Sequence, residues 1–532
     1  MHFATPTSCM ECGRGRLESE VLSFTLGLSP VPELVGTNHT PSEFEADAIR
    51  DTIFGLQPSI SALDNDIAQV QATLTELQRK RQVLHNYFQE HKSLLSSIRR
   101  FPEELLGEIF SHCLPERWQD RTLRRVKAPL ILTQICRHWR AIAISTRKLW
   151  SSVVYESQSS SDIVFTKLWL ARGGNCAMNV RISQPFVDSR LGTYIVQQVV
   201  GLLISHSERW RNLEIFLRPS MCSLIATVKD RLPILQSLAI CAHGTFTDQS
   251  INAFERAPLL RSLNLSAPLY LLDIPWAQLD ELMIDSANFG WAVAMLGHTA
   301  NLTDFRLTSM VNCNPVPPGV IHNNQLRSLA IHFISIDAPG KLFDCLALPA
   351  LQDVCIMQDK KRPLAPWICQ EQLISLLSRS RCSLRRLAFH DVSLTDGELI
   401  ECLEHAPSLV ELELRDAASY SITNDALHRL IYRNPEDAQV ACLAPALQVI
   451  ELDAFNILNE SLFMDMVQSR SRIGIESSDT MSQLKKVAIS LRYADGQLEQ
   501  VVFARARVRQ LRDEGLDISV VQHFEGGSSF TL

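Results

Sequence analysis

The sequence lacks the features that identify membrane proteins and the commonest enzyme sites. No uninterrupted apolar run approaches the roughly 20 residues that a membrane-spanning helix needs, and YIVQQVVGLLI (194–204), the most apolar stretch, is broken by two glutamines. The N-terminal VLSFTLGLSPV follows two glutamates and lacks a clean small-residue cleavage site, so no secretory signal is expected. The motifs GxSxG, GxGxxG, GxxxxGK[ST] and HExxH are absent. We expect a non-enzymatic protein of the cytoplasm or nucleus, with no membrane partner.

An excess of positive charge is also missing. The chain has 51 lysines and arginines against 58 aspartates and glutamates, a formal net charge of −7. Binding to phosphate backbones needs a basic face, so we expect no nucleic-acid partner. The basic stretch RTLRRVK (121–127) is local and follows acidic residues, and we interpret it as a solvated loop.

Cysteines are present but are not arranged as ligands. The fourteen cysteines are scattered, most of them singly in apolar segments, which is typical of reduced cysteines in a protein core. The one CxxC pair, Cys9 and Cys12, has no second CxxC or HxxxH nearby to supply the remaining zinc ligands. We expect no metal, no cofactor and no catalytic residue.

What the sequence does contain is enough apolar residues for a large core. Of 532 residues, 46% are hydrophobic and 20% charged, which predicts several folded units rather than general disorder. Residues 1–55 carry scattered Pro, Gly, Ser and Thr without a sustained period. We expect these residues to form a poorly ordered tail.

A heptad pattern follows Pro58. Apolar residues recur on alternating steps of three and four, and Arg81 and His91 occupy two positions of the same seam; the apolar members are Ile60, Leu63, Ile67, Val70, Leu74, Leu77, Leu84, Phe88 and Leu95. This spacing predicts a coiled-coil helix over residues 58–97. The seam could pair two copies of the chain as a homodimer or pack back on its own protein, and both alternatives stay open.

Two helices are predicted between residues 98 and 152. Pro102 suits a first helical turn, and the two glutamates after it favour the positive end of a helix. The apolar stripe of this helix comprises Leu105, Leu106, Ile109, Phe110 and Cys113. After a polar break at 116–127, Pro129 begins a second helix with the apolar stripe Leu132, Ile135, Cys136, Trp139, Ile142 and Ala143.

The segments FPEELLGEIFSHCLP and PLILTQICRHWRAIAISTRKLW together resemble an F-box, the helical module that docks on the Skp linker of SCF ubiquitin ligases. The matching features are Pro-x-Glu-Leu-Leu-x-x-Ile-Phe, Cys-Arg-x-Trp-Arg and the closing Leu-Trp. The segment between Leu114 and Leu130 departs from the usual pattern, because it is longer and more charged. The resemblance covers residues 98–152 and implies a linker-docking surface at Pro102, Leu105, Ile109 and Phe110, with Trp139 and Trp150 supporting or joining it.

The rest of the chain repeats one template: proline, any residue, leucine, two residues, apolar, any residue, apolar. The prolines of the five full copies are Pro233, Pro258, Pro349, Pro407 and Pro445. Proline stops a preceding helix, and the alternation that follows suits a half-buried strand. The pattern resembles a leucine-rich-repeat solenoid over residues 153–524, followed by a tail at 525–532. The spacing is uneven and no copy has asparagine or cysteine at the ninth position, so we expect an irregular array within an α/β fold.

Residues that alternate with the apolar strand positions should line the concave face of such an array. Those that we take as target-binding candidates are Arg306, His332, Arg386, His390, Glu411, Glu413 and Arg415, and the same face should carry Glu281, Asp285, Asp304, Glu451 and Asp453. A solvated strand face without a partner is the alternative for each of them.

Two functions are compatible with this organisation. The chain is either a substrate-recognition adaptor of an SCF ubiquitin ligase or a non-catalytic interaction scaffold that acts without ubiquitin transfer. The adaptor would hold the Skp linker, and through it a cullin, by the F-box and a protein target by the repeats. The identity of the target cannot be inferred from the sequence.

Overall fold

The computed structural model divides the chain into two compact units, residues 1–102 and residues 103–532. Each unit is described by itself. The structure describes residues 27–121, 127–156, 159, 161–183, 190–217, 223–242, 251–266, 272–285, 289–310, 319–335, 337–359, 367–415, 424–432, 442–455, 459–471, 482–493, 505–524 and 529–531.

The first unit is dominated by one long helix, α1 (Glu43–Leu94). It begins well before the expected start at residue 58, so the expected tail at 1–55 is wrong for its C-terminal part. The reason is a capping box: the Ser42 hydroxyl accepts from the Glu45 N–H, and the Glu45 carboxylate accepts from the Ser42 N–H at 2.8 Å. Pro58 lies inside the helix rather than at its start.

The second unit opens with three helices, α2 (Glu103–His112), α3 (Leu132–Ile135) and α4 (Arg137–Ser145). The expected second helix is therefore split. Cys136 between α3 and α4 has an extended backbone, and its Sγ accepts a hydrogen bond from the Trp139 N–H at 3.4 Å. Because of this break, side chains before and after Cys136 do not lie on one continuous helix face. The predicted stripe across this point is for that reason only partly buried.

A single parallel sheet makes up most of the second unit. Within the described residues its fifteen strands lie in chain order from β1 to β17, and all neighbours are parallel except the last pair, β16 and β17. The strands are β1 (Ser152–Tyr155), β2 (Met178–Ser183), β3 (Trp210–Leu217), β4 (Ser237–Ala242), β5 (Ser262–Ser266), β6 (Glu281–Asp285), β7 (Asp304–Met310), β9 (Ser328–Phe333), β11 (Asp353–Gln358), β12 (Arg386–His390), β13 (Glu411–Arg415), β14 (Val449–Phe455), β15 (Lys486–Tyr493), β16 (Asp517–Phe524) and β17 (Ser529–Thr531). A separate two-stranded sheet pairs β8 (Ile321–His322) with β10 (Leu346–Ala347).

The end of the chain differs from the expected tail at 525–532. Residues Ser529–Thr531 form β17, which pairs antiparallel with β16. A short strand can satisfy the backbone groups of a sheet edge. The composition of these residues did not predict the strand.

The repeated template predicts the strand positions accurately. In all five full copies the strand begins four residues after the proline, at Ser237, Ser262, Asp353, Glu411 and Val449. The template leucines are fully buried, with 0% exposure at Leu235, Leu260, Leu351, Leu409 and Leu447. The same leucine position therefore supplies one buried side chain per copy to a continuous core.

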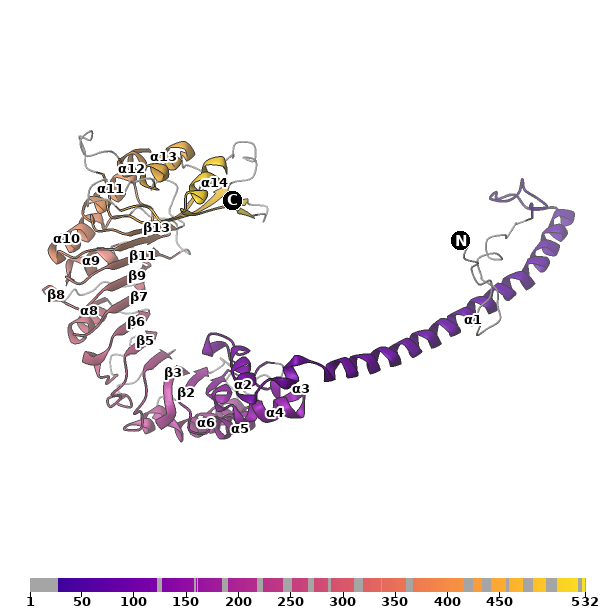
Figure 1. The fold of residues 1–532 in the computed structure, drawn as a ribbon, viewed down its shortest axis with the longest axis horizontal. Coiled ribbons are helices and arrows are strands. Elements are labelled where there is room, and N and C mark those ends of the chain that lie inside the picture. Colours follow the sequence, from indigo (N-terminus) through magenta and orange to yellow (C-terminus); the bar gives the residue numbers. More distant parts are fainter. Residues whose placement is uncertain are drawn as a thin grey trace. The chain divides into compact units, whose positions relative to one another are not determined.

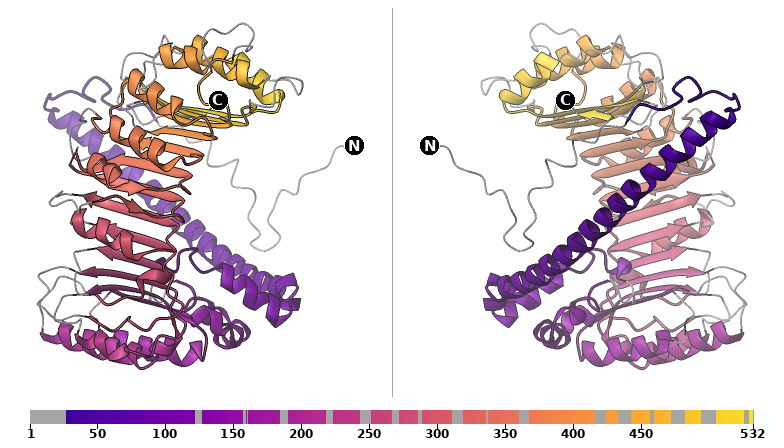
Figure 2. Two further views of the ribbon diagram at one scale, coloured as in Figure 1. Left: turned by 90° about the vertical axis from the view of Figure 1, so that its left-hand side faces the viewer. Right: turned by 90° about the vertical axis from the view of Figure 1, so that its right-hand side faces the viewer.

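Helices and turns cover one face of the sheet and leave the other face open (Figures 1 and 2). The longer connections contain α5 (Ser161–Gly173), α6 (Arg190–Ile204), α8 (Phe289–His298), α9 (Ala338–Asp344), α10 (Gln370–Ser380), α11 (Asp396–Glu404), α12 (Asn424–Leu430), α13 (Glu460–Ser471) and α14 (Arg505–Asp513). None of the helices in the described ranges has the length and apolar composition needed to cross a membrane. The structure is thus a mixed α/β chain with a long N-terminal helix and a many-stranded parallel sheet.

One charged side chain lies entirely within this core. Arg470 on α13 is 0% exposed, and its guanidinium donates to the carbonyl oxygens of Leu430 at 2.6 Å and Ala444 at 3.0 Å, and also to that of Leu443. Burial lowers the pKa of Arg470, because removal from water disfavours its charge. The backbone carbonyls compensate for the lost hydration and tie α13 to the end of α12.

We predict that Arg470→Met destabilises the second unit by about 3 kcal/mol, because buried carbonyls without a donor cost about 1–3 kcal/mol each. Urea unfolding followed by circular dichroism measures the change. Arg385→Met removes an exposed arginine and serves as the matched control. Equal unfolding midpoints for the two variants would show that the buried hydrogen bonds contribute nothing.

Candidate partner-binding surfaces

Helix α2 has one buried and one exposed apolar face. Leu106 and Phe110 are 0% and 1% exposed, whereas Leu105 and Ile109, one turn apart, are 53% and 42% exposed. Burying exposed aliphatic side chains of this size stabilises an interface by about 1.5–3 kcal/mol each. Leu105 and Ile109 therefore form an apolar pair that is available to a partner.

The next two helices also carry exposed apolar side chains. Ile131, just before α3, and Ile135 at its end are 40% and 57% exposed. Trp139 on α4 is half-buried, and its ring lies 4.8 Å from that of Phe110, at an angle of 50°. This contact packs α4 against α2. The sequence predicts Ile135 on the apolar stripe of one continuous helix and does not single out Ile131, because the break at Cys136 cannot be inferred from the spacing.

The six linker-binding candidates therefore divide by exposure. Pro102, directly before α2, is exposed like Leu105 and Ile109. Phe110 is buried and cannot contact a partner directly, which corrects its assignment to the binding surface. Trp150 is also buried, which is compatible with a supporting role. The Trp150 Nε1 donates to the Ala143 carbonyl at 2.7 Å, and its ring meets Trp169 of α5 edge-on at 4.8 Å. Trp150 thus supports the helices from within.

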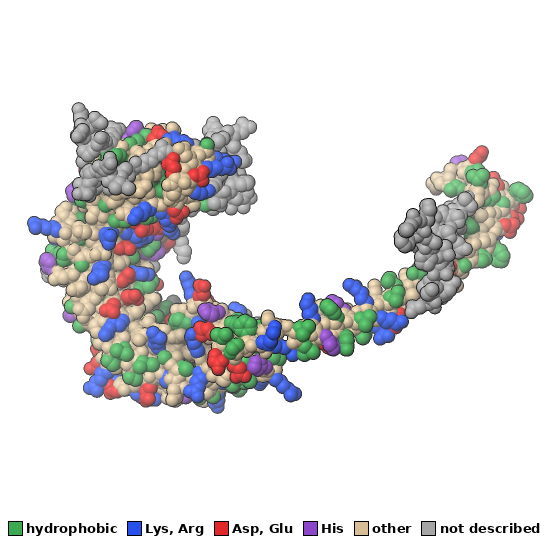
Figure 3. Space-filling view, viewed as in Figure 1, with side chains coloured by type: hydrophobic (Ala, Val, Ile, Leu, Met, Phe, Trp, Pro, Cys, Tyr) green, Lys and Arg blue, Asp and Glu red, His purple; other side chains and the backbone are tan. Residues whose placement is uncertain are grey.

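The open face of the sheet carries the polar residues that alternate with the buried ones. The register aligns Asp353, Arg386 and Glu411 on neighbouring strands, and likewise Glu413 with Glu451. Because the side chains of a strand alternate between its two faces, these aligned residues project from the same side of the sheet. In the space-filling view, acidic and basic side chains lie intermixed over the second unit (Figure 3).

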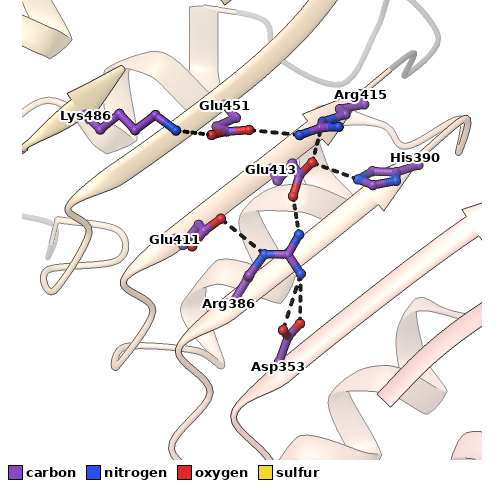
Figure 4. A network of polar contacts seen from close by, with 8 residues as sticks. All are labelled: Asp353, Arg386, His390, Glu411, Glu413, Arg415, Glu451 and Lys486. Atoms are coloured by element: carbon purple, nitrogen blue, oxygen red, sulfur yellow. Dashed lines mark hydrogen bonds and ion pairs between the residues drawn. The ribbon is translucent and has the colours of Figure 1, made fainter. Parts of the chain in front are cut away.

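Eight of these side chains form one charge network, whose centre is Glu413 (Figure 4). Glu413 is only 2% exposed. Its carboxylate pairs with the guanidinium groups of Arg386 and Arg415, and lies 3.1 Å from the His390 Nε2. An anion buried to this degree needs cationic partners to offset its lost hydration. Arg386 and His390 belong to β12, so their contacts with Glu413 join β12 to β13.

Further ion pairs extend this network over the neighbouring strands. Arg386 also donates to Asp353 at 3.0 Å and Glu411 at 3.1 Å. Arg415 donates to Glu451 at 3.0 Å, and Lys486 pairs with the same carboxylate at 2.6 Å. The network therefore spans β11 to β15.

The pKa values of the network follow these contacts. Burial alone would lower the pKa of Arg386, but the carboxylates of Asp353 and Glu413 outweigh burial, and the pKa is raised. The hydrogen bond from Lys486, helped by that from Arg415, lowers the pKa of Glu451. The same bond raises the pKa of Lys486. The three groups are accordingly held in their charged forms.

The seven target-binding candidates occupy different environments. Arg306 and Arg415 are exposed, Glu413 is buried, and the remaining four are half-buried, namely His332, Arg386, His390 and Glu411. Glu413 is wrong as a contact residue, because its carboxylate is saturated by charged neighbours inside the chain. Sequence alternation placed it on the right face but could not show that the neighbours cover it.

A polar groove at the other end of the open face was not foreseen from the sequence. Its volume is about 630 Å³, and it lies between the segment around η2 (Trp118–Asp120) and strands β2 to β7. The charged residues that line it are Arg117, Asp120, Arg181, Glu214, Glu281, Asp304 and Arg306. Burial raises the pKa of Glu214, although Arg181 opposes that shift from 3.5 Å away. Residues 117–120, from the charged segment after Leu114, thus form one wall of a groove on the sheet.

Metal sites are not evident in the part of the chain that the structure describes, where no group of three or more His, Cys, Asp or Glu side chains could hold an ion. The pair Cys9 and Cys12 and most of the basic stretch 121–127 lie outside the described residues.

Comparison with known proteins finds matches among solved structures. No family model matches the chain, and no curated protein matches it. Among solved structures, a chain from the "Crystal structure of Rad7 and Elc1 complex in yeast" is 14% identical, with 75% of this chain and 97% of that chain covered and a TM-score of 0.32. The functional assignment of this chain rests on its own residues and geometry.

We predict that Glu451→Gln lowers stability by about 1 kcal/mol near neutral pH, because a charge-assisted contact is lost. The folded-state pKa of Glu451 lies below the ordinary 4.5. The wild-type advantage is therefore present above pH 4.5 and disappears as the pH falls through the lowered value. Thermal unfolding of both proteins between pH 3 and pH 7 measures the difference, with Glu116→Gln at an exposed position as control. A difference that does not shrink on acidification contradicts the ionic role.

Proposed function

We propose that this chain is a substrate-recognition adaptor of an SCF ubiquitin ligase. The observation that carries the proposal is the exposed pair Leu105 and Ile109 on α2, whose opposite face is buried. A folded helix that keeps its buried face and still exposes large aliphatic residues is typical of a docking surface. The resemblance of residues 98–152 to an F-box names the partner as a Skp linker, and through it a cullin.

The parallel sheet then holds the target protein. We assign residues 153–524 as an irregular leucine-rich-repeat solenoid, because the template leucine of each full copy is buried at the same place before a strand. The target would meet the open face, where Arg306 and Arg415 remain exposed. The groove of about 630 Å³ beside Arg306 is a recessed part of that face, and we take it as the first candidate contact.

The adaptor itself performs no chemistry in this proposal. Its role is to raise the effective concentration of target lysines near a ubiquitin-charged enzyme on other subunits. Such a role needs no cofactor and places the chain in the cytoplasm or nucleus. Both properties follow from the proposed assembly.

We predict that Leu105→Ala combined with Ile109→Ala abolishes co-purification of the Skp linker. Removing two anchor residues from the centre of an interface costs several kcal/mol of binding energy, whereas both side chains are already exposed in the free chain. A pull-down from cells, probed for the linker and for a cullin, measures the loss. Val164→Ala with Tyr194→Ala removes two exposed apolar side chains elsewhere and is the control.

The same pull-down separates the adaptor from the scaffold. Undiminished linker binding by the double variant overturns the docking surface. A wild-type complex that contains no cullin favours the alternative, an interaction scaffold that acts without ubiquitin transfer.

We predict that Arg117→Glu with Arg306→Glu weakens target capture about tenfold, through electrostatic mismatch in the groove. Both arginines are exposed, so the fold and linker binding should persist. Target and linker recovery from one pull-down measures the effect. Arg231→Glu with Arg256→Glu, at surface ion pairs outside the groove, is the control. Equal target recovery by the variant and the wild type would place the contact outside the groove. Charge reversal at Glu413 is not used, because it would disrupt the ion pairs of the charge network.

A further inference from the structure

The heptad seam of α1 is not covered along most of its length. The structure extends the seam upstream of residue 60, so that in heptad notation the a positions are Ile53, Ile60, Ile67, Leu74, Arg81 and Phe88, and the d positions are Leu56, Leu63, Val70, Leu77, Leu84 and His91. No residue of α1 is buried, and the apolar side chains from Leu56 to Phe88 on this seam are 38–69% exposed. In Figure 3 hydrophobic side chains recur along the helix. Apolar residues at the a and d positions of successive heptads are typical of helices that pair as coiled coils.

The N-terminal end of the seam already has an occupant from its own unit. Residues 29–41 run beside the start of α1, and Val31 and Leu34 line a cavity of about 280 Å³ together with Ile49 and Ile53. The seam left for another helix therefore starts at Leu56. The last apolar seam position within α1 is Phe88, because Leu95 follows the end of the helix at Leu94. The midpoint of the uncovered seam is therefore residue 72.

We propose that a second copy of this chain covers the seam in the antiparallel direction, with the two-fold axis at residue 72. The numbers of residues that share a core layer then sum to 144, and those of g positions that face each other sum to 146. Each a position meets a d position of the second copy, and the layers are Leu56 with Phe88, Ile60 with Leu84, Leu63 with Arg81, Ile67 with Leu77, and Val70 with Leu74. Every uncovered apolar seam residue from Leu56 to Phe88 is placed opposite another seam residue.

The charges beside the seam support this register. In an antiparallel coiled coil, g positions face g positions of the partner and e positions face e positions. Asp66 and Lys80, both at g, then face each other twice by symmetry. Arg81 meets Leu63 of the second copy, and Asp64 beside that leucine lies on the same edge of the interface, within reach of the guanidinium. Four acid–base contacts result for the dimer.

The parallel arrangement lacks these contacts. It would place Arg81 against Arg81 and His91 against His91 inside the seam. The flanking pairs between g and the following e position would be Thr52–Gln57, Ser59–Asp64, Asp66–Gln71, Thr73–Gln78, Lys80–His85 and Tyr87–Lys92. None of these joins an acid to a base. Like charges within the core cost energy without compensation, so the antiparallel direction is favoured.

The decisive test uses the full chain with Ile60→Cys and Leu84→Cys together, under mild oxidation. These positions are roughly 36 Å apart along one helix, at 1.5 Å per residue, and a disulfide needs Cα atoms within about 7 Å. A 60–84 disulfide must therefore join two copies, and mass spectrometry of the linked peptides is expected to find it. A 60–60 disulfide, or no dimer-linking disulfide, overturns the proposal. Asn65→Cys with Arg79→Cys, on the outer face and with the same sum, is the control, and the wild-type chain reports links among native cysteines.

Light scattering checks the assembly itself. The wild-type chain should have twice the 59.9 kDa mass of one copy, and Leu74→Asp with Leu77→Asp should return it to the single mass. A wild-type monomer overturns the proposal. Because no residue of α1 is buried in the chain, these changes leave the second unit folded, and its circular dichroism verifies this.

A charge exchange tests the register. Asp66→Lys or Lys80→Asp alone should weaken dimerisation about three- to tenfold, and the two together should restore most of it, because only the antiparallel register couples these positions across the interface. Asp51→Lys, on the outer face of α1, is the matched control and should change little. If the double variant loses as much dimerisation free energy as the two single variants together, the register is wrong.

Discussion

The second unit depends on strands that cannot exist singly. Each strand obtains its backbone hydrogen bonds from the strands before and after it in the chain, and each full copy of the template adds one leucine with 0% exposure to the layer beneath. A single copy would leave its strand without backbone hydrogen-bond partners and its leucine exposed. Each copy is therefore stable only when neighbouring copies are present. The proline before each leucine ends the preceding segment at the same distance from the strand, which keeps the copies aligned.

The alternation along each strand determines which side chains point to the open face of the sheet. It does not determine which of them remain exposed to solvent. On β11 to β15, acidic and basic residues come close enough to neutralise one another, and Glu413 disappears beneath Arg386, Arg415 and His390. Near β2 to β7 the open face is instead hollowed, because the segment around η2 stands over it. The two ends of one face thus differ in character: the first is a rigid surface of paired charges, and the second a polar groove with exposed arginines at Arg117 and Arg306.

Apolar residues are used in opposite ways in different parts of the chain. In the sheet they fill a core, whereas on α1 and on one face of α2 they remain in water. Exposed aliphatic residues at helical spacing need a partner helix or a groove to be stabilised. We therefore regard α1 and α2 as the places where this chain meets other chains, a second copy in one case and a linker in the other.

The sequence by itself determined the strand positions, the heptad seam, the helix at α2 and the alternation of the sheet, since each of these rests on periodicity or on proline within a short window. The ends of the helices were harder to predict. Helix α1 begins at the capping box of Ser42 and continues through Pro58, and Cys136 splits a helix that the spacing showed as continuous. Only the tertiary structure decided burial. Phe110 and Trp150 belong to the core because other elements pack on them. Ile131 and Ile135 stay exposed because no other element covers them. Glu413 is enclosed by Arg386 and His390 of the neighbouring strand and by Arg415 of its own strand. Such contacts join residues distant in sequence, and no local pattern encodes them.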